Sequence, residues 1–469
     1  MADMTRSGMG DLEITWTHGI ESRDGMLTSD AQMVNALVEK DSQGVCCVKR
    51  PGTVYTNPTG PQGTAQGSVY INGVLWWIVN DKLYINGTTA LIITLPGLTV
   101  MDLQYSTLSD FVVGTSYLHN GVQMWKIVGT TATLVSGSPT PLSPGFVELD
   151  GVAYVMDTSG VIHGSAINDA ATWPALDFVR ADYSLGSGAG ISRHLNYIMG
   201  FYDRGLQVYW DANAAPNGSG IALSPALSAS YTTGTANGHT IQELADVTYF
   251  VSLDKEYGPS VQSMQGLQMS KVSDVYVDKM LQNVNLSLLQ STVIRVAGHP
   301  LYILNSGDAF SFTLVYDIST QIWSTWTTRV SGVVRPFAGR YGAQNNLAQY
   351  MQDTSTGLVM EVLPNVYTDA NGTIPVSCTT PNYEWGNLNY KRFSYMQQIA
   401  ATTTTSINIS FTDDDYQTFS TPRSISLQYP RKQLRNCGAS RSRAWMMTHE
   451  DNTPLRLYAV KIAATVLSR

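Results

Sequence analysis

The chain has 469 residues, a formal net charge of −8 at pH 7 and 14% charged residues, against roughly 25% in a typical soluble domain. This length suits two or three domains, and the abundance of Tyr, Trp, Gly and Thr favours strands and tight turns over helices. The cysteines Cys46, Cys47, Cys378 and Cys437 form neither a disulfide framework nor a metal-binding pattern, so we expect buried or idle thiols made in a reducing cytoplasm.

Membrane, secretion and metal signals are weak throughout the sequence. The most apolar stretches, at 74–79 and 90–101, are shorter than the roughly 20 residues that cross a bilayer. Residues 1–16 contain acidic side chains and no apolar core, so we expect no secretory signal. The histidines show no HxH or HExxH spacing. We therefore predict no membrane span, no metal site and no cofactor.

The N-terminal segment, residues 1–45, is the least regular part of the chain. Its stretch "SDAQMVNALVEK" (29–40) has a possible capping residue, Ser29 or Asp30, but few apolar side chains on a helical spacing. The pattern is compatible with a helix or with a strand. We expect this segment to join the C-terminal domain.

Residues 46–375 contain short apolar strands separated by turn residues. In 68–87, the steps Asn72-Gly73 and Asn80-Asp81 are typical of hairpin turns. Similar segments recur at irregular intervals of 35 to 54 residues, a spacing typical of β-propeller blades, which bury their faces by stacking against one another. We therefore predict an all-β chain with a β-propeller over 46–375. The repeated segments are 68–87, 110–128, 145–167, 194–212, 246–266 and 300–326.

One of these segments, "YDISTQIWSTW" (316–326), could be read in two ways. As a blade hairpin, it would place Trp323 or Trp326 between neighbouring blades, and Trp173 would have a similar structural role in an earlier hairpin. As a sugar-binding shelf, it would need an exposed tryptophan beside polar groups. The hairpin interpretation is favoured.

The strand pattern and the charge both change near residue 376. Residues 376–469 read as alternating Thr-, Ser- and Ile-rich strands, so we predict a small β-sandwich platform domain. This part holds 11 Lys and Arg against 6 Asp and Glu, a net charge of +5, and the rest of the chain therefore carries −13. Its basic cluster could contact an acidic partner protein or DNA, or could be a solvated loop. The cluster consists of Arg431, Lys432, Arg435, Arg441 and Arg443.

The only motif with a catalytic association is "SFTDDDYQTF" (410–419). It approaches the Asp-box of sialidases, but Tyr416 stands where the box has glycine, and Asp-boxes are turns remote from the active site. The arginines before residue 329 show no arrangement that would hold a carboxylate. A glycan-binding or sialidase-like propeller glycosidase is thus the alternative, and no catalytic residue is predicted.

Several stretches together resemble one protein family. The segment ending in Lys-Arg-Pro-Gly (35–52) resembles the opening of the tail nozzle proteins of short-tailed bacteriophages, also called tail-hub or packaged-DNA stabilisation proteins. Residues 165–182, with "WPALDF", resemble a hairpin of that family, and 249–274 and 316–326 resemble later blades. Residues 413–427, followed by the arginine-rich loop, resemble its terminal sandwich.

The resemblance implies a non-enzymatic virion tail protein made in the host bacterial cytoplasm. It implies a six-bladed propeller with a platform domain, assembled as a ring of six copies below the portal and the head-to-tail adaptor. Such a ring would continue the DNA channel, retain the packaged double-stranded genome, release it at ejection, and carry tail fibres or spikes. Tyr416, in place of a glycine-bearing turn, departs from the family pattern.

Overall fold

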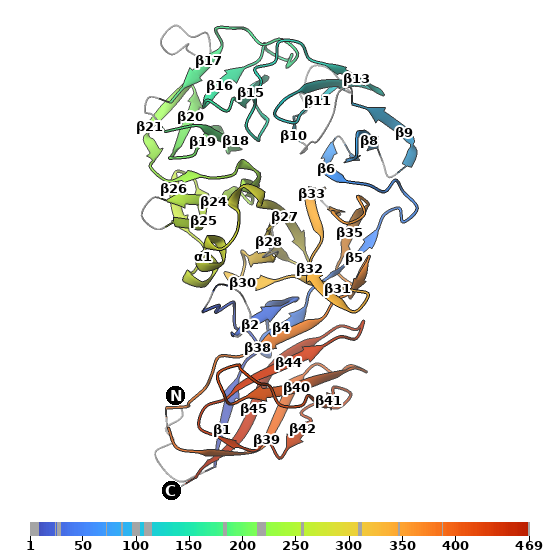
Figure 1. Cartoon of the computed structure of the whole chain (residues 1–469), viewed down its shortest axis with the longest axis vertical. Helices are drawn as coiled ribbons and strands as arrows, with labels where there is room; N and C mark the ends of the chain where they lie inside the picture. The colour runs from blue at the N-terminus through green and yellow to red at the C-terminus, as the bar shows by residue number, and fades with distance from the viewer. Residues whose placement is uncertain are drawn as a thin grey trace.

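The chain forms two bodies: a ring of small antiparallel sheets and a two-sheet sandwich that contains the first and last strands (Figure 1). The architecture is all-β with a β-propeller, as the sequence predicts. The computed structural model describes residues 9–23, 25, 30–71, 73–85, 88–95, 104–106, 115–181, 185–212, 222–254, 258–307, 312–345, 348–386 and 388–467.

The ring begins with four sheets in which consecutive strands are neighbours. A tight turn connects β7 to β8, where Asn80 has a φ of 55°, a conformation that Asn tolerates better than most residues. The strands are β6 (Ala65–Ile71), β7 (Val74–Val79), β8 (Lys82–Ile85) and β9 (Thr88–Thr94); β10 (Gln104–Ser106), β11 (Thr115–His119), β12 (Met124–Val128) and β13 (Thr131–Leu134); β14 (Val147–Leu149), β15 (Val152–Met156), β16 (Val161–Gly164) and β17 (Phe178–Arg180); β18 (Gly188–His194), β19 (Tyr197–Tyr202), β20 (Leu206–Asp211) and β21 (Leu223–Tyr231).

Three further units follow, so the described residues form seven units in succession, and the predicted number of six blades is not confirmed. The fifth unit is a five-stranded sheet, and the sixth belongs to a larger sheet shared with the sandwich. The strands are β22 (Gly234–Thr235), β23 (Gln242–Leu244), β24 (Val247–Asp254), β25 (Gly258–Gln265) and β26 (Gln268–Lys271); β27 (Gln290–Val296), β28 (His299–Asn305), β29 (Thr313–Asp317) and β30 (Ile322–Thr325); β33 (Gly339–Gln344), β34 (Gln349–Asp353), β35 (Val359–Leu363) and β5 (Gly52–Tyr55).

The seventh unit closes the ring by combining segments distant in sequence. Its strand order is β33-β34-β35-β5, and β5 pairs antiparallel with β35, with Tyr55 opposite Met360 and Gly52 opposite Leu363. Backbone hydrogen bonds between β5 and β35 thus join the first strand of the propeller to its last sheet. Closure of this kind leaves few free strand edges, which would otherwise pair with other chains.

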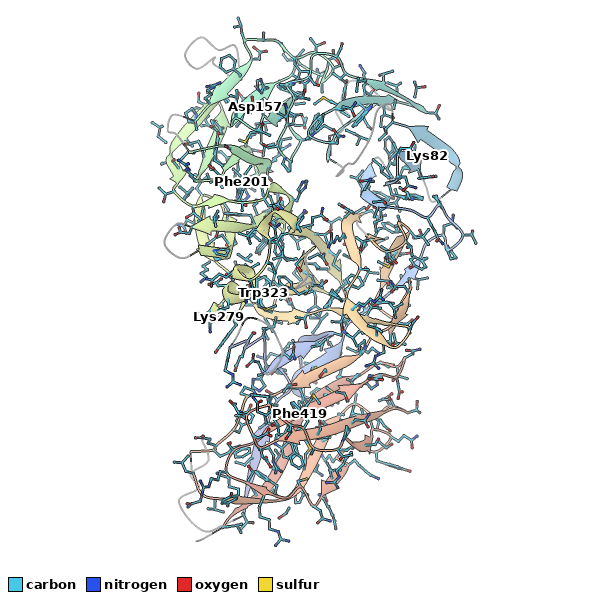
Figure 2. All side chains as sticks on the ribbon, in the orientation of Figure 1. Lys82, Asp157, Phe201, Lys279, Trp323 and Phe419 are labelled. Atoms are coloured by element: carbon cyan, nitrogen blue, oxygen red, sulfur yellow. The ribbon has the colours of Figure 1, made fainter. Side chains whose placement is uncertain are left out.

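A shared turn recurs in three units. After β15, β29 and β34, an aspartate accepts hydrogen bonds through one carboxylate oxygen from the backbone N–H and the hydroxyl of the serine two residues later. The segment "YDISTQIWSTW" (316–326) thus contains one of three similar Asx turns. Asp157, labelled in Figure 2, lies in the first of these turns. The pairs are Asp157 with Ser159, Asp317 with Ser319, and Asp353 with Ser355.

The sandwich packs two sheets around a core that contains Trp16, Cys47, Cys378 and Trp445. One nine-stranded sheet runs from the sixth ring unit through β2 into the sandwich. The second sheet has the order β3-β4-β45-β39-β42, with β1 and β43 at its side. The strands are β2 (Gln32–Val34), β38 (Val376–Thr379), β40 (Ser406–Thr412), β41 (Arg423–Ser426) and β44 (Ala444–His449); β1 (Met9–Ile14), β3 (Ala36–Asp41), β4 (Gly44–Lys49), β39 (Lys391–Ala400), β42 (Gln433–Arg435), β43 (Ala439–Ser440) and β45 (Arg456–Val466).

Residues 30–40 form strands β2 and β3, separated by Asn35 at a φ of 55°, so the strand alternative is correct there; Ser29 lies outside the described residues. A four-stranded sheet of β31 (Thr327–Val330), β32 (Val333–Pro336), β36 (Thr368–Asp369) and β37 (Gly372–Thr373) lies where the ring meets the sandwich (Figure 1).

Helix α1 (Val275–Gln282) was not predicted from the sequence. Asp274 caps it by accepting a hydrogen bond from the Val277 N–H. Within the described ranges, no helix has the length and apolar character to cross a membrane. Short 3₁₀ turns occur at Gly238–Thr240 and Leu286–Leu288.

Candidate functional site

The predicted basic cluster divides into exposed and buried members. Arg431, Lys432, Arg435 and Arg441 are exposed at the sandwich surface, around β42 and β43. Arg443 is 1% exposed and lies at the start of β44, inside the sandwich. Four of the five predicted residues are therefore available to a partner protein or DNA.

Arg443 is a structural residue, which corrects its assignment as a contact candidate. Its Nε and Nη2 donate to both oxygens of Asp413 at 2.6 and 2.7 Å. Its guanidinium carbon lies 3.8 Å from the centre of the Phe411 ring and 4.4 Å from that of Phe393. A planar guanidinium held by a bidentate carboxylate and two aromatic faces has no side left for a phosphate.

The three tryptophans named from sequence lie between structural units. Trp323, 3% exposed, packs 5.0 Å from the Tyr316 ring and donates its Nε1–H to the Val272 carbonyl, which follows the last strand of the preceding unit (Figure 2). Trp326 is fully buried near the sandwich. Trp173 is half-buried and packs against side chains of the second and third units.

A buried ion pair lies where the ring meets the sandwich, between Arg50, in the connection from β4 to β5, and Asp369 on β36. It was not predicted from the sequence. Arg50 donates through Nη1 and Nη2 to the two oxygens of Asp369 at 2.9 and 2.6 Å, and both side chains are 0% exposed. Its Nε donates to the Asn35 Oδ1 at 2.9 Å. The guanidinium also stacks over Trp326 and Phe337 at 4.8 and 4.9 Å. Arg50 belongs to the Lys-Arg-Pro-Gly segment noted in the sequence, but its partner Asp369 lies 319 residues away, so no local pattern predicts the pair.

A second polar network crosses the same junction. His299, on β28 of the ring, approaches the Asp317 Oδ2 through Nδ1 at 2.7 Å and the Glu39 Oε1, on sandwich strand β3, through Nε2 at 3.7 Å. Glu39 is also paired with Arg456 on β45. Burial alone would lower the pKa of His299, but the hydrogen bond and charge of Asp317, together with Glu39, outweigh it and raise that pKa.

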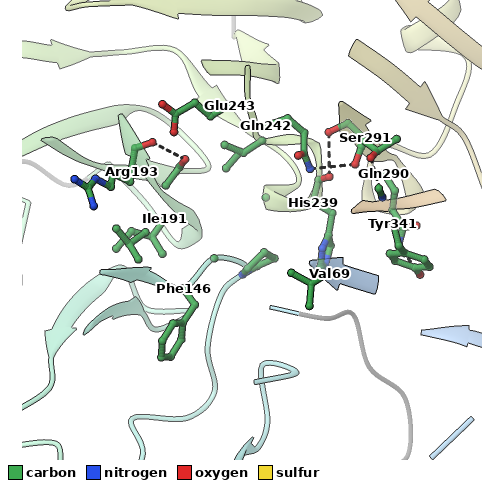
Figure 3. Close-up of a pocket in the computed structure, with 18 of the residues that line it drawn as sticks. Val69, Phe146, Ile191, Arg193, His239, Gln242, Glu243, Gln290, Ser291 and Tyr341 are labelled. Carbon is green, nitrogen blue, oxygen red and sulfur yellow. Dashed lines mark hydrogen bonds between the residues drawn. The ribbon is translucent and has the colours of Figure 1, made fainter. Parts of the chain in front are cut away.

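A cavity of about 660 Å³ lies at the centre of the ring (Figure 3). Residues of β6, β14, β18, β23, β27 and β33, from six units, line it. Figure 3 shows His239, Gln242 and Ser291 on one wall and Phe146 on another. The wall is therefore mixed, with polar side chains and backbone beside a few apolar groups.

The charged side chains described in the lining of this cavity are Glu148, Arg193 and Glu243. Arg193 lies 3.8 Å from Glu148 and is the one arginine among its described lining residues, whereas a sialidase converges three arginines on its substrate carboxylate. Burial, followed by the nearby charge of Asp246, raises the pKa of Glu243. The described residues contain no cluster of three or more His, Cys, Asp or Glu that could hold a metal ion. The four cysteines are free and buried.

The family comparison accounts for this architecture. The family described as "Bacteriophage P22 Gp10, beta-propeller" matches residues 36–361, from β3 into β35. The chain belongs to the tail-hub (packaged-DNA stabilisation) family of short-tailed bacteriophages. This tail-hub protein is accordingly a phage virion component, and the resemblance seen in the sequence is confirmed. No curated protein matches the chain.

Solved structures similar to the tail-hub protein are distant. They include "YCF48 bound to D1 peptide" at 12% identity, covering 67% of this chain and 98% of that chain with a TM-score of 0.40. A chain of the mitotic checkpoint complex matches at 11% identity, covering 67% and 94%, with a TM-score of 0.39. PorZ of the Porphyromonas gingivalis type-IX secretion system matches at 10% identity, covering 75% and 44%, with a TM-score of 0.38. At these scores the similarities carry no argument about function.

Proposed function

We propose that this tail-hub protein is the subunit of a tail nozzle, a ring of six copies that continues the DNA channel below the portal and adaptor. The ring would retain the packaged genome and release it at ejection. The observation that carries this proposal is the family match over 36–361, on a chain whose propeller is closed by the β5–β35 pairing. A closed propeller attached to a platform by buried polar contacts suits a rigid wall component.

The central cavity of one propeller is lined by side chains and backbone of six units. The channel in this proposal is the space enclosed by the ring of copies, and each propeller contributes an outer surface to its wall.

The proposed partners are other virion proteins: the head-to-tail adaptor, and tail fibres or spikes. We propose no catalytic role, since the features found in the described residues are structural contacts and a mixed cavity with a single arginine. The excess of acidic residues in 1–375 supports a wall that repels passing DNA, because like charges within about a Debye length, roughly 8 Å at physiological salt, resist contact.

Genome retention gives a direct test. Phage particles assembled without this chain are expected to lose DNA, measured as nuclease-sensitive genome copies, and to regain retention when the purified protein is added. Electron microscopy of the complemented particles should show a ring of six copies at the tail. Full retention without the chain would overturn the proposal, and release of sugar from host polysaccharide by the purified chain would favour the glycosidase alternative.

A further inference from the structure

Strands β39 and β42 of the sandwich lie in the part of the molecule far from the ring (Figure 1). The outer side of their sheet carries exposed basic and aromatic side chains. Met396 and Leu434 pair in register and point into the core, at 0% and 8% exposure. Because side chains alternate along a strand, the neighbouring pair Tyr395 and Arg435 projects from the opposite face. We call this outer side, with its bordering turns, the distal face.

The distal face holds cations without anionic partners. Five basic residues are exposed on it, and within the described part of the chain none of them forms an ion pair. The other sandwich arginines differ, because Arg443 is paired with Asp413, and Arg456 with Glu39 and Asp41. The exposed cations are Arg392, Arg431, Lys432, Arg435 and Arg441.

Two exposed tyrosines lie beside these cations: Tyr390 is 51% and Tyr429 64% exposed. Leu388, two residues before Tyr390 in the sequence, is 72% exposed. The Lys432 Nζ lies 5.6 Å from the centre of the Tyr429 ring, and the Arg441 guanidinium 5.0 Å from that of Tyr390. Stacking on the rings limits the motion of both cations, which lowers the entropy lost on binding. Tyr and Arg are also the residues enriched at the centres of protein–protein interfaces.

We propose that the distal face docks an acidic surface of another virion protein. This inference rests on the proposed function. Two observations favour a protein over duplex DNA. The three exposed apolar side chains would bury little area against a phosphate backbone, and the face belongs to a multi-stranded sheet, not to a helix or two-stranded ribbon that enters a groove.

Charge segregation would orient the chain in this contact. Residues 376–469 carry a net +5 and residues 1–50, which also enter the sandwich, a net −3, so the sandwich carries +2 against −10 for residues 51–375. An acidic partner is therefore attracted to the sandwich and repelled by the propeller. Complementary charges suppress the reversed orientation and speed association, while burial of the tyrosines and Leu388 provides the affinity.

Attachment to particles lacking this chain tests the inference. Purified wild-type protein and two double variants, Lys432→Glu with Arg441→Glu and Tyr390→Ser with Tyr429→Ser, would be mixed with such particles, and the co-sedimenting fraction measured. All four positions lie outside the strands, so the fold should be retained, as checked by thermal unfolding. The matched control is Lys82→Glu with Arg180→Glu, two exposed cations of the ring. A 30-base-pair duplex tests DNA binding by fluorescence anisotropy.

We expect both double variants to weaken attachment at least tenfold and the control to change it less than twofold. Equal attachment of variants and wild type would overturn the distal face as the docking surface while leaving the nozzle function intact. Loss with the charge variant alone, with a parallel loss of duplex binding, would overturn it in favour of DNA contact. Failure of the wild type to attach would overturn the nozzle function and this inference with it.

Discussion

The contacts between ring units and the junction between ring and sandwich use different chemistry. Between the fifth and sixth units, aromatic and aliphatic side chains such as Tyr249, Tyr302 and Trp323 pack together. At the junction, a fully buried Arg50–Asp369 pair and the His299 network connect the two bodies. Apolar packing tolerates small rearrangements, whereas a bidentate ion pair requires one geometry. The units of the ring thus pack on one another mainly through apolar burial, whereas the junction with the sandwich depends on specific polar contacts.

The largest effect is expected from breaking the junction pair. Arg50→Ala leaves the Asp369 carboxylate buried without its cation and removes the stacking on Trp326 and Phe337. We expect a loss of about 5 kcal/mol in the free energy of unfolding, measured by urea denaturation. Arg50→Lys keeps the charge but not the fork geometry and should recover only part of the loss. A loss below about 1 kcal/mol would show that the junction does not depend on this pair.

Truncating the inter-unit tryptophan should cost slightly less. Trp323→Ala creates a cavity between neighbouring units and removes the hydrogen bond to the Val272 carbonyl. We expect a loss of about 4 kcal/mol in unfolding free energy. Trp210→Ala is the matched control, because that side chain is 46% exposed, and should cost far less. If the two substitutions were equally mild, inter-unit packing would not be what stabilises the ring.

The closing unit gives an intermediate effect. Asp353 caps its turn through Ser355 and accepts a hydrogen bond from the Tyr55 hydroxyl on β5 at 2.6 Å, so it links the turn to the closing strand. We expect Asp353→Ala to lower the unfolding free energy by about 2–3 kcal/mol. Asp157→Ala removes a similar turn on an internal unit and should cost less. The reverse order would contradict a special role for ring closure.

The smallest effect, and the one that depends on pH, is expected at His299. Because Asp317 and Glu39 raise its pKa above the ordinary 6.5, the folded state binds the proton more tightly than the unfolded state. The resulting stabilisation is fully present below pH 6.5 and is lost as pH rises through the raised folded pKa. We therefore expect the free energy of unfolding of His299→Gln to lie about 2 kcal/mol below that of the wild type at pH 6. This difference should shrink as the pH rises towards 9. A difference independent of pH would show that the imidazolium charge contributes nothing.

Local patterns were the most predictable part of this protein. The hairpin steps, the Asx turn of "YDISTQIWSTW" and the change of character near residue 376 depend on neighbouring residues, and the all-β propeller fold followed from them. The sequence analysis also identified the exposed cations around β42. Arg443 was grouped with these exposed cations, because the spacing of charges in a sequence does not show that Asp413 and Phe411 enclose its side chain.

By itself, the sequence determined strand-forming segments, turns, the segregation of charge and membership of the tail-hub family, because each is carried by residues close together in the chain. Only the tertiary structure decided the seven-unit succession, the pairing of β5 with β35 and the match of Arg50 to Asp369. Contacts across some 300 residues arise from how the whole ring closes, and no local preference specifies which distant partner a strand or a charge will meet.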